Sequence, residues 1–363
     1  MPDTAARAGR RVGIKDVAAA AGVSWKTVSN VVNGTGRVGA ATRERVQKEI
    51  ATLGYRPNIA GRQLRSGRTN TLALVVPWVH SPYFSALAHR VIEAASLRGY
   101  RVLIEETRVD RDAELRVAQG FQVHAIDGII FSPLAIGPVE IDEVRGETPM
   151  VLLGERDSPR REGVRRTDHV GIDNVLAARE VTEHLLGTGR SRLAFLGADP
   201  SPAGSGEETR TLRVQGFLDA HAGRAGSPAE PGWIVPVPDF SRPSGARAIE
   251  EMLPRIGSID GLVCANDELA LGVLYALRTN GVRVPHDLAV TGWDNIEDGR
   301  FSSPTLTTVA PDVQAIAAAA VDRVVGQVEY AGDGAPPATE VVVPHRVLVR
   351  ESSRELAAEN EPV

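Results

Sequence analysis

The sequence predicts a small all-α domain followed by a much larger α/β domain, and three observations support this division. Between residues 14 and 53, apolar residues recur at helical spacing in three short segments. From residue 70 onward, short apolar runs alternate with longer amphipathic segments, which is the pattern of βαβ units with parallel strands. The net charge changes at nearly the same place, because residues 1–68 carry +9 and the remaining residues carry −14. Such a split predicts a basic arm that meets a polyanion.

The N-terminal domain is expected to contain three helices that are stable only when packed together. We expect them at residues 14–21, 25–32 and about 42–53, with Ser24 as the N-cap of the second helix. Glycines follow each of the three segments and end the helices. The residues expected to face the shared core are Ile14, Val17, Ala18, Ala21, Val28, Val32, Val46, Ile50 and Leu53.

The larger domain is expected to be built around parallel strands. The expected strands are residues 72–76, 101–105, 128–131, 151–154, 170–172, 193–197, 262–265, 288–291 and 341–343. The helices expected between them include residues 82–98, 175–186, 269–280 and 313–328. Residues 351–363 are expected to be a polar tail.

Length and composition limit the class of protein. A chain of 363 residues with 42% hydrophobic and 24% charged residues is typical of a globular protein with two or three domains. The first eleven residues are polar and basic, and no apolar run approaches the roughly 20 residues that span a bilayer. We therefore expect a cytoplasmic protein without membrane contact. The single cysteine, Cys264, excludes an intrachain disulfide, and the eight histidines lack H-x-x-x-H spacing, so neither a metal nor a cofactor is expected.

Residues 14–34, which read IKDVAAAAGVSWKTVSNVVNG, closely resemble the helix-turn-helix of the LacI/GalR family. The match continues through TRERV at 42–46 and LGYRPN at 53–58. In such a motif a glycine permits the turn between two crossing helices, and the second helix projects polar side chains into the major groove. The resemblance implies a transcriptional regulator, and most often a repressor, that binds a near-palindromic operator as a homodimer. We expect the helix-turn-helix domain at 12–57, after a disordered basic tail at 1–11.

The resemblance also assigns roles to the DNA-binding residues. It assigns base reading to Trp25, Lys26 and Asn30, because lysine can read guanine and asparagine can read adenine. Many family members have an arginine in place of Asn30, so the operator sequence stays open. The phosphate or sugar contacts implied by the resemblance are Ser24, Thr27, Ser29 and Asn33.

Residues 58–70 resemble the hinge helix and linker of the same family. A segment this short, interrupted by Gly61, cannot hold a helix unaided, so we expect the hinge to order only on DNA. The resemblance places Leu64 where a leucine wedges between base pairs in the minor groove and kinks the duplex. It also places Ala60 among the DNA contacts.

Residues 71–350 resemble the family's periplasmic-binding-protein-like core, which carries effector binding and dimerisation. The resemblance implies two doubly wound α/β subdomains, joined by crossings expected near residue 173, at 298–303 and at 330–338. The predicted fold class is therefore an N-terminal all-α helix-turn-helix domain plus this α/β core.

Ligands of doubly wound sheets lie beyond the carboxyl ends of the strands, so candidate effector residues should follow strands. Guanidinium and carboxylate groups can bind neighbouring hydroxyls of a sugar, while an aromatic ring covers its apolar face. The candidates that follow a strand or match a family ligand position are Tyr83, Phe84, Asp173, Arg213, Phe240, Asn266, Asp267 and Asp294. Asn174 and Trp293 also follow strands. Asn266 and Asp267 could equally cap a helix, and Phe84 could be a core residue.

Several functional alternatives remain open at this point. A sugar is favoured as the small-molecule effector, but the rings of Tyr83, Phe84 and Phe240 could also sandwich a purine base. Inducer and corepressor are both compatible with the sequence. A sugar-binding transport protein would share the larger domain, but it should carry an export signal. An enzyme is not expected, since the chain has no G-x-S-x-G and no Walker-type glycine loop. The C-terminal tail lacks a leucine repeat, so we expect a dimer rather than a tetramer.

Overall fold

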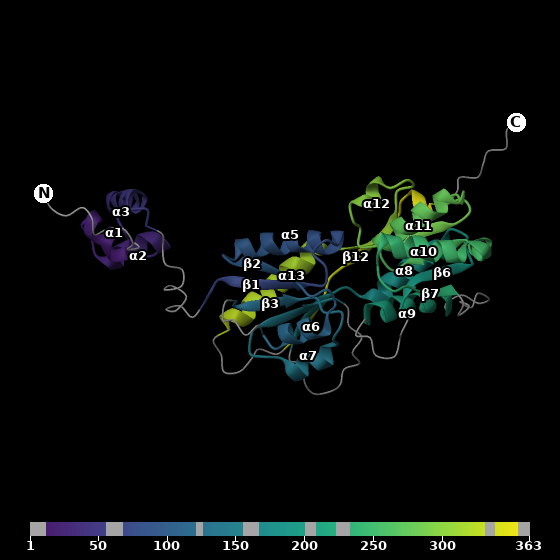
Figure 1. The fold of residues 1–363 in the computed structure, drawn as a ribbon, viewed down its shortest axis with the longest axis horizontal. Coiled ribbons are helices and arrows are strands. Elements are labelled where there is room, and N and C mark those ends of the chain that lie inside the picture. The colour runs from purple at the N-terminus through teal and green to yellow at the C-terminus, as the bar shows by residue number, and fades with distance from the viewer. Residues whose placement is uncertain are drawn as a thin grey trace. The chain divides into compact units, whose positions relative to one another are not determined.

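The computed structural model describes residues 12–55, 68–120, 126–154, 167–199, 208–222, 233–330 and 338–354. Contacts divide the chain into two compact units, Met1–Thr69 and Asn70–Val363 (Figure 1). The predicted tail at 1–11 and most of the predicted hinge at 58–70 lie outside the described residues. Within the described part of the chain, no helix combines the length and the hydropathy that a membrane span requires.

The first unit is the predicted bundle of three short helices. Its helices are α1 (Ile14–Ala21), α2 (Trp25–Asn33) and α3 (Ala40–Thr52). Gly22 and Gly34 follow α1 and α2 with φ angles of 63° and 68°, a left-handed conformation that costs a glycine little. The turn between α1 and α2 is therefore set by the glycine that the sequence places there.

A small valine-rich core holds these helices together. Val17, Val28 and Val46 contribute one fully buried side chain from each helix. The prediction that Val32 faces this core was incomplete, because Val31 is buried as well and Val32 is only half-buried. Both positions lie about one helical turn after Val28, so spacing alone did not separate them.

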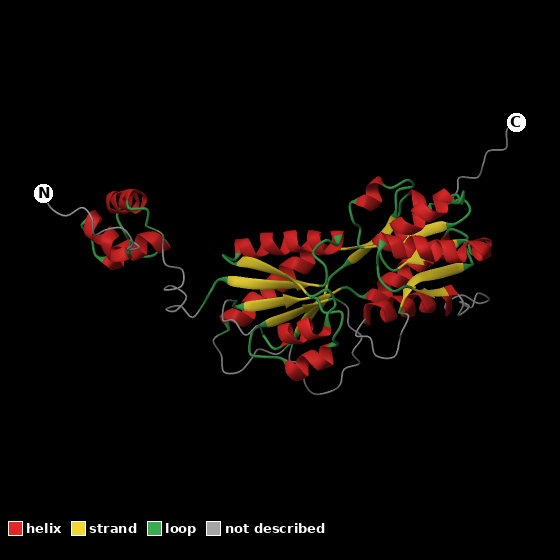
Figure 2. Cartoon of the chain, viewed as in Figure 1, coloured by secondary structure: helices red, strands yellow, loops and turns green. Residues whose placement is uncertain are grey.

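The second unit contains two six-stranded sheets, each covered by helices on both faces (Figures 1 and 2). The first sheet has the strand order β11-β5-β4-β3-β1-β2, and all its pairs are parallel. Its strands are β1 (Thr71–Val76), β2 (Arg101–Glu106), β3 (Gly128–Phe131), β4 (Met150–Leu153), β5 (Asp168–Gly171) and β11 (Glu340–Val342). The helices that pack on it are α5 (Pro82–Leu97), α6 (Arg111–Ala118), α7 (Pro138–Val144) and α13 (Val313–Glu329).

Strand β1 explains why this sheet is covered on both sides. All six of its residues are buried, and consecutive side chains point to opposite faces. Leu72 and Leu74 pack into the core that includes α5 and α13, whereas Ala73 and Val75 pack into the core of α6 and α7. A continuous apolar run is therefore the correct sequence signal for this strand.

The second sheet has the strand order β12-β10-β9-β8-β6-β7, with only β10 and β12 antiparallel. Its strands are β6 (Leu193–Ala198), β7 (Ile234–Pro236), β8 (Gly261–Cys264), β9 (Ala289–Trp293), β10 (Thr307–Pro311) and β12 (His345–Leu348). Helix α8 (Asn174–Gly187) packs with α9 (Glu208–Ala222), and α10 (Arg242–Met252) packs with α11 (Asp267–Thr279). The two pairs cover opposite faces, since neighbouring residues of β9 contact α9 and α11.

The chain passes between the two sheets three times. It does so at Ile172 and Asp173, between β5 and α8, and at Asp312, between β10 and α13. The third passage is at Val343 and Pro344, between β11 and β12. Each sheet is thus built from segments that are distant in the sequence.

The predicted positions of the second and third crossings were wrong. Residues 298–303 contain the short helix α12 (Asp298–Phe301) and precede β10, which still belongs to the second sheet. Residues 330–338 precede β11, which pairs with β5 of the first sheet. Both errors have one cause: the sequences of β10 and β12, TTVAP and HRVL, lack the continuous apolar run that marks strands such as β1 and β3.

The predicted polar tail at 351–363 begins too early. Glu351–Ser353 form a single 3₁₀ turn in which Ser352 and Ser353 are fully buried. The Ser352 hydroxyl donates to the carbonyl of Val290 at 2.6 Å, so this turn is docked on β9. Residues 355–363 lie outside the described residues.

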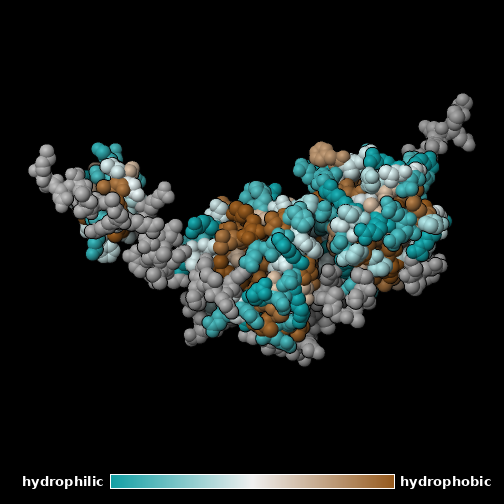
Figure 3. Space-filling model, viewed as in Figure 1, coloured by the Kyte–Doolittle hydropathy of each residue, from teal (hydrophilic) through white to brown (hydrophobic). Residues whose placement is uncertain are grey.

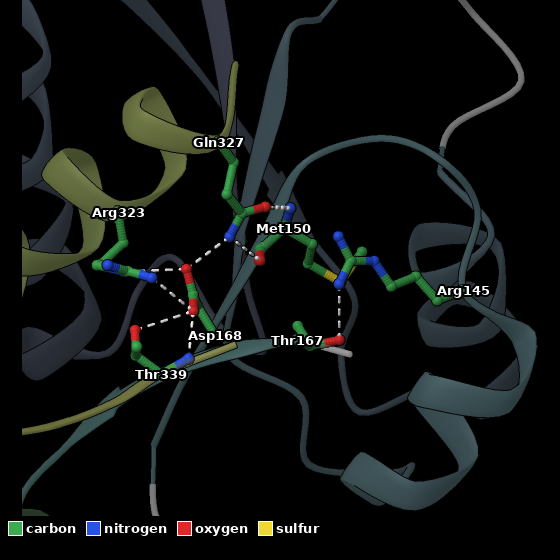
Figure 4. A network of polar contacts seen from close by, with 7 residues as sticks. All are labelled: Arg145, Met150, Thr167, Asp168, Arg323, Gln327 and Thr339. Carbon is green, nitrogen blue, oxygen red and sulfur yellow. Dashed lines mark hydrogen bonds and ion pairs between the residues drawn. The ribbon is translucent and has the colours of Figure 1, made fainter. Parts of the chain in front are cut away.

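A buried carboxylate ties α13 to the first sheet (Figure 4). Asp168 on β5 accepts two hydrogen bonds from the Arg323 guanidinium, both at 3.0 Å. It also accepts from Gln327 at 2.7 Å and from the backbone N–H of Thr339 at 2.6 Å. Burial raises the pKa of Asp168, but these hydrogen bonds outweigh burial and hold the pKa below its ordinary value. The carboxylate therefore stays ionised and fixes α13 and the approach to β11.

Candidate functional site

The first turn of α2 presents polar and aromatic side chains to solvent. The Ser24 hydroxyl accepts from the backbone N–H of Thr27 at 3.1 Å and lies 2.9 Å from the Thr27 hydroxyl, so Ser24 is the N-cap. Trp25 is 51% exposed and Lys26 is also exposed. A large aromatic ring left in water does not serve the core of this unit, which makes it available for contact with a partner.

The other predicted DNA contacts differ in their surroundings. Ser29 and Asn30 are half-buried on α2. The Asn30 amide lies against Gly36, where a Cβ would come within 2.7 Å of Nδ2. Asn33 ends α2, while Ala60 and Leu64 lie outside the described residues. The structure therefore brings Ser24, Trp25, Lys26 and Thr27 together and gives Asn30 a contact with the following loop.

A cavity of about 400 Å³ in the second unit is lined by residues from both sheets, and we call it the effector cleft. It lies beyond the carboxyl ends of the strands, as its lining by Trp78 after β1, Ser132 after β3 and Asn266 after β8 indicates. The predicted effector residues that line it are Tyr83, Phe84, Arg213, Phe240, Asn266 and Asp294.

Arg213 on α9 is buried and held in place in the wall of the cleft. Its Nε donates to the side-chain oxygen of Asn174 at 2.9 Å, and a second nitrogen donates to the carbonyl of Ala265. Its guanidinium lies 3.9 Å from the centre of the Trp293 ring. Such stacking and hydrogen bonding pre-organise the guanidinium, so a ligand need not order it.

A second arginine of the cleft, Arg210, was not predicted from the sequence. It lies one helical turn before Arg213, donates to the carbonyls of Ala198 and Val237 and stacks 4.2 Å from the centre of the Phe240 ring. Residues three apart are neighbours on a helix surface, so the spacing between Arg210 and Arg213 was a signal in the sequence that Arg210 lies near the same site.

Asp239 is a further cleft residue that the sequence did not single out. Its carboxylate accepts from the Ser241 backbone N–H at 3.1 Å and from the Ser244 hydroxyl at 2.7 Å. Burial raises the pKa of Asp239, but hydrogen bonds from the two serines outweigh this effect, so the pKa is lower than usual. The cleft thus contains an ionised acceptor near Arg210.

Asp294 lies on a tight turn at the end of β9. Its φ angle is 101° and that of Asn295 is 54°, a left-handed conformation that non-glycine residues rarely adopt. The backbone N–H of Asp294 donates to the carbonyl of Val309 at 2.9 Å, which holds the turn to β10. Strain of this kind is concentrated at binding sites, where surrounding contacts fix a side chain in place.

Two predicted effector residues, Asp173 and Asp267, do not line the cleft. Asp173 is exposed and accepts from the backbone N–H of Leu176 at 2.8 Å, so it caps α8. Asp267 is fully buried and accepts from the Thr308 hydroxyl at 2.7 Å and from the Ile296 backbone N–H at 2.9 Å. Burial raises the pKa of Asp267 to about 7. Both acids follow strands, but they serve the protein's own backbone.

The remaining predicted residues combine ligand and structural positions. Asn266 lines the cleft and also caps α11, because its side-chain oxygen accepts from the Leu269 backbone N–H at 2.9 Å. Tyr83 and Phe84 line the cleft from the first turn of α5, with ring centres 5.2 Å apart in an edge-to-face arrangement. Both rings also pack against the apolar core.

The loop after β3 forms part of the cleft wall and is held by a buried acid. The Glu114 carboxylate accepts from the backbone N–H groups of residues 134–136 at 2.9 to 3.1 Å. Burial raises the pKa of Glu114, and these hydrogen bonds counter only part of that effect. Further cleft residues that the sequence did not single out are Trp78, His80, Ser132, His169 and Glu268. No cluster of three or more His, Cys, Asp or Glu in the described ranges could hold a metal ion.

Comparison with known proteins gives this architecture a family. A sequence profile described as bacterial regulatory proteins of the lacI family matches residues 13–58, and one described as a periplasmic binding protein-like domain matches residues 182–353. The catabolite control protein A of Priestia megaterium is 30% identical over 94% of this chain and 99% of its own length. This chain belongs to the LacI family. Family membership makes it a DNA-binding transcriptional regulator, with the first unit as its DNA-binding domain.

A further relative and two solved structures also match most of this chain. The transcriptional repressor PurR of Aliivibrio fischeri is 31% identical over 85% of this chain and 89% of its own length. A solved complex of the regulator CelR with cellobiose is 29% identical, with a TM-score of 0.67, over 94% of this chain and all of that one. The Lac repressor dimer bound to operator has the same fold, with a TM-score of 0.76 at 24% identity over 95% of this chain and 99% of that one.

Proposed function

We propose that this regulator represses transcription as a homodimer on a near-palindromic operator, and that a sugar bound in the effector cleft changes its affinity for the operator. The observation that carries the proposal is the chemistry of the cleft. It combines fixed guanidinium groups from Arg210 and Arg213 with carboxylates from Asp239 and Asp294.

This lining suits a sugar better than a nucleobase. A sugar presents hydroxyls on nearly every ring carbon, and each hydroxyl can donate to a carboxylate and accept from a guanidinium. The ring of Phe240 adds an apolar surface for the face of a pyranose. The likeness to CelR, whose solved complex contains cellobiose, supports the same choice.

A purine is the second candidate effector, and the aromatic rings of the cleft favour it. Tyr83, Phe84 and Phe240 all line the cleft and could stack on a flat base. The acidic side chains weigh against a purine, because a base offers fewer donors to them than a sugar does.

The first unit supports operator binding through both charge and shape. Residues 1–68 carry a net charge of +9, which favours contact with phosphates and predicts strong dependence on salt. Trp25 and Lys26 are exposed at the start of α2, where a recognition helix contacts base edges. Specific reading by Lys26 and Asn30 and wedging by Leu64 belong to the same proposal.

An apolar surface on the first sheet supports the homodimer. Strand β2 is the outer strand of that sheet, and its Leu103 and Ile104 are 54% and 41% exposed. Ile92 and Leu97 of the neighbouring α5 are 44% and 89% exposed. Figure 3 shows hydrophobic surface gathered over this part of the molecule. An exposed apolar edge strand of this kind needs a covering partner, and a second copy of the chain provides an identical edge.

Coupling between the two sites is proposed to run through residues 58–70. Effector binding that shifts the two subdomains also shifts the start of β1, to which these residues connect. A coupling free energy of about 1 to 3 kcal/mol alters operator affinity roughly 5- to 150-fold. The direction of this change distinguishes an inducer from a corepressor.

Isothermal titration calorimetry with a defined panel tests the effector assignment. The sugars of the panel are glucose, galactose, ribose, cellobiose and maltose. Adenine, guanine and hypoxanthine test the alternative of a purine effector. We expect one sugar to bind, Asp294→Ala to abolish its binding, and Asp173→Ala to leave it intact, because only Asp294 lines the cleft. Binding of purines alone would replace the sugar by a purine, and equal losses in the two variants would place the site elsewhere.

A further inference from the structure

Trp293 occupies an unusual position in the wall of the effector cleft. It ends β9, only 1% of its surface is exposed, and it lines the cleft directly before Asp294. One face of its ring is covered by the Arg213 guanidinium at 3.9 Å. The ring is therefore fixed in position before any ligand enters.

The indole N–H of Trp293 has no acceptor among the residues that the structure describes. A buried donor without an acceptor is rare, since it loses its hydrogen bond to water on folding and gains nothing in return. Among the described residues, the hydroxyl of Thr291, two residues earlier on the same face of β9, also has no hydrogen-bond partner, so the two groups do not satisfy each other.

The polar groups around Arg213 are already engaged. The side-chain oxygen of Asn174 accepts from Arg213 Nε, and the carbonyl of Ala265 accepts from the same guanidinium. The side-chain oxygen of Asn266 accepts from the Leu269 backbone N–H at 2.9 Å. These acceptors therefore anchor Arg213 and α11, and none of the described residues accepts a hydrogen bond from the indole N–H.

We propose that the indole N–H of Trp293 donates a hydrogen bond to an acceptor atom of the effector and thereby selects effectors that carry an acceptor at this place. For a sugar, the acceptor is a ring, glycosidic or hydroxyl oxygen. This inference rests on the proposed function of the cleft and adds a donor to the guanidinium and carboxylate groups described above. A site built around a donor discriminates strongly against ligands that leave it unpaired.

The direct test observes the indole proton itself. The chain has four tryptophans, so a sample with ¹⁵N-labelled indoles gives four side-chain N–H signals, and Trp293→Phe identifies the one from Trp293. The probe is the compound of the calorimetry panel with the lowest dissociation constant. We expect its addition to move the Trp293 signal downfield and to slow the exchange of that proton with water. A Trp293 signal that stays in place at saturation would overturn the inference.

Affinity supplies an independent readout. Phenylalanine keeps an aromatic ring beneath Arg213 but removes the N–H, so Trp293→Phe should raise the dissociation constant of the same compound roughly 10-fold or more. Trp233→Phe is the matched control, because Trp233 stacks near Arg255 at 5.2 Å and does not line the cleft. Circular dichroism of both variants checks the fold. An unchanged affinity in folded Trp293→Phe contradicts the inference. If no sugar binds but a purine binds and shifts the Trp293 signal, only the choice of a sugar is contradicted.

Discussion

Replacement of Asp267 by asparagine should change how the stability of this protein depends on pH. Asp267 is fully buried, and its carboxylate fixes the turn beyond β9 through Ile296 and β10 through Thr308. Burial raises its pKa from the ordinary value of 3.8 to about 7. The unfolded chain exposes the same group to water, so folding and protonation of this one side chain are linked.

The sign of the effect follows from the raised pKa. Between pH 3.8 and about pH 7, the folded protein keeps the proton on Asp267 while the unfolded chain loses it. The free energy of unfolding therefore falls as the pH rises, by at most about 1.4 kcal/mol per pH unit for a single group. Between pH 5 and pH 7 this amounts to about 2 kcal/mol. Asparagine has no proton to lose, so the unfolding free energy of the variant should rise by about 2 kcal/mol relative to that of the wild type between pH 5 and pH 7.

Urea unfolding at pH 5, 6 and 7, followed by circular dichroism, measures this difference. The other acids of the protein titrate in both proteins, so their contributions cancel in the comparison between variant and wild type. A difference in unfolding free energy that is the same at all three pH values would refute the reasoning. It would mean that Asp267 is ionised throughout and that burial does not dominate its surroundings.

Two further predictions concern the DNA-binding unit and the dimer. Ser24→Ala removes the side-chain acceptor that caps α2, so it should destabilise the first unit by about 1 kcal/mol and lower its melting temperature. Ser24→Asn retains a capping side chain and should not lower the melting temperature. Equal melting temperatures for Ser24→Ala and wild type would contradict the capping role. Leu103→Glu places a charge in the apolar edge of the first sheet, so sedimentation velocity should detect monomer where the wild type is a dimer, and Leu348→Glu on β12 of the second sheet serves as a control. A Leu103→Glu protein that still sediments as a dimer would move the interface away from β2.

Much of the fold could be predicted because local sequence signals agree with it. The strand at 128–131 was predicted with the bounds that the structure has, since its four residues are buried on both faces and read as a continuous apolar run. Helix α1 follows from the helical spacing of its apolar residues and the glycine after it, and α2 follows from its N-cap Ser24 and the glycine that ends it. Strands β10 and β12 were missed because threonine, proline and charged residues interrupt them, and their place in the sheet depends on partners distant in the sequence.

The candidate site could be predicted only in outline. Asn266 and Asp294 follow from the rule that ligand residues lie beyond strands, and Arg213 follows from the resemblance to family ligand positions. The structure places all three in the cleft. The same rule also selects Asp173, which caps α8, and Asp267, which is buried and accepts from the backbone of Ile296. Whether an acid after a strand faces the cleft depends on the turn that follows it, and sequence alone does not fix that turn.

The central claim is that a ligand in the effector cleft controls operator binding by the first unit. The most direct measurement is fluorescence anisotropy of the full chain on labelled genomic fragments, at two salt concentrations, with and without the sugar that binds most tightly in calorimetry. The account predicts selective binding to a near-palindromic fragment and a change of roughly 5- to 150-fold in affinity when the sugar is added. Binding that depends on salt, ignores sequence and is the same with and without the sugar would contradict it.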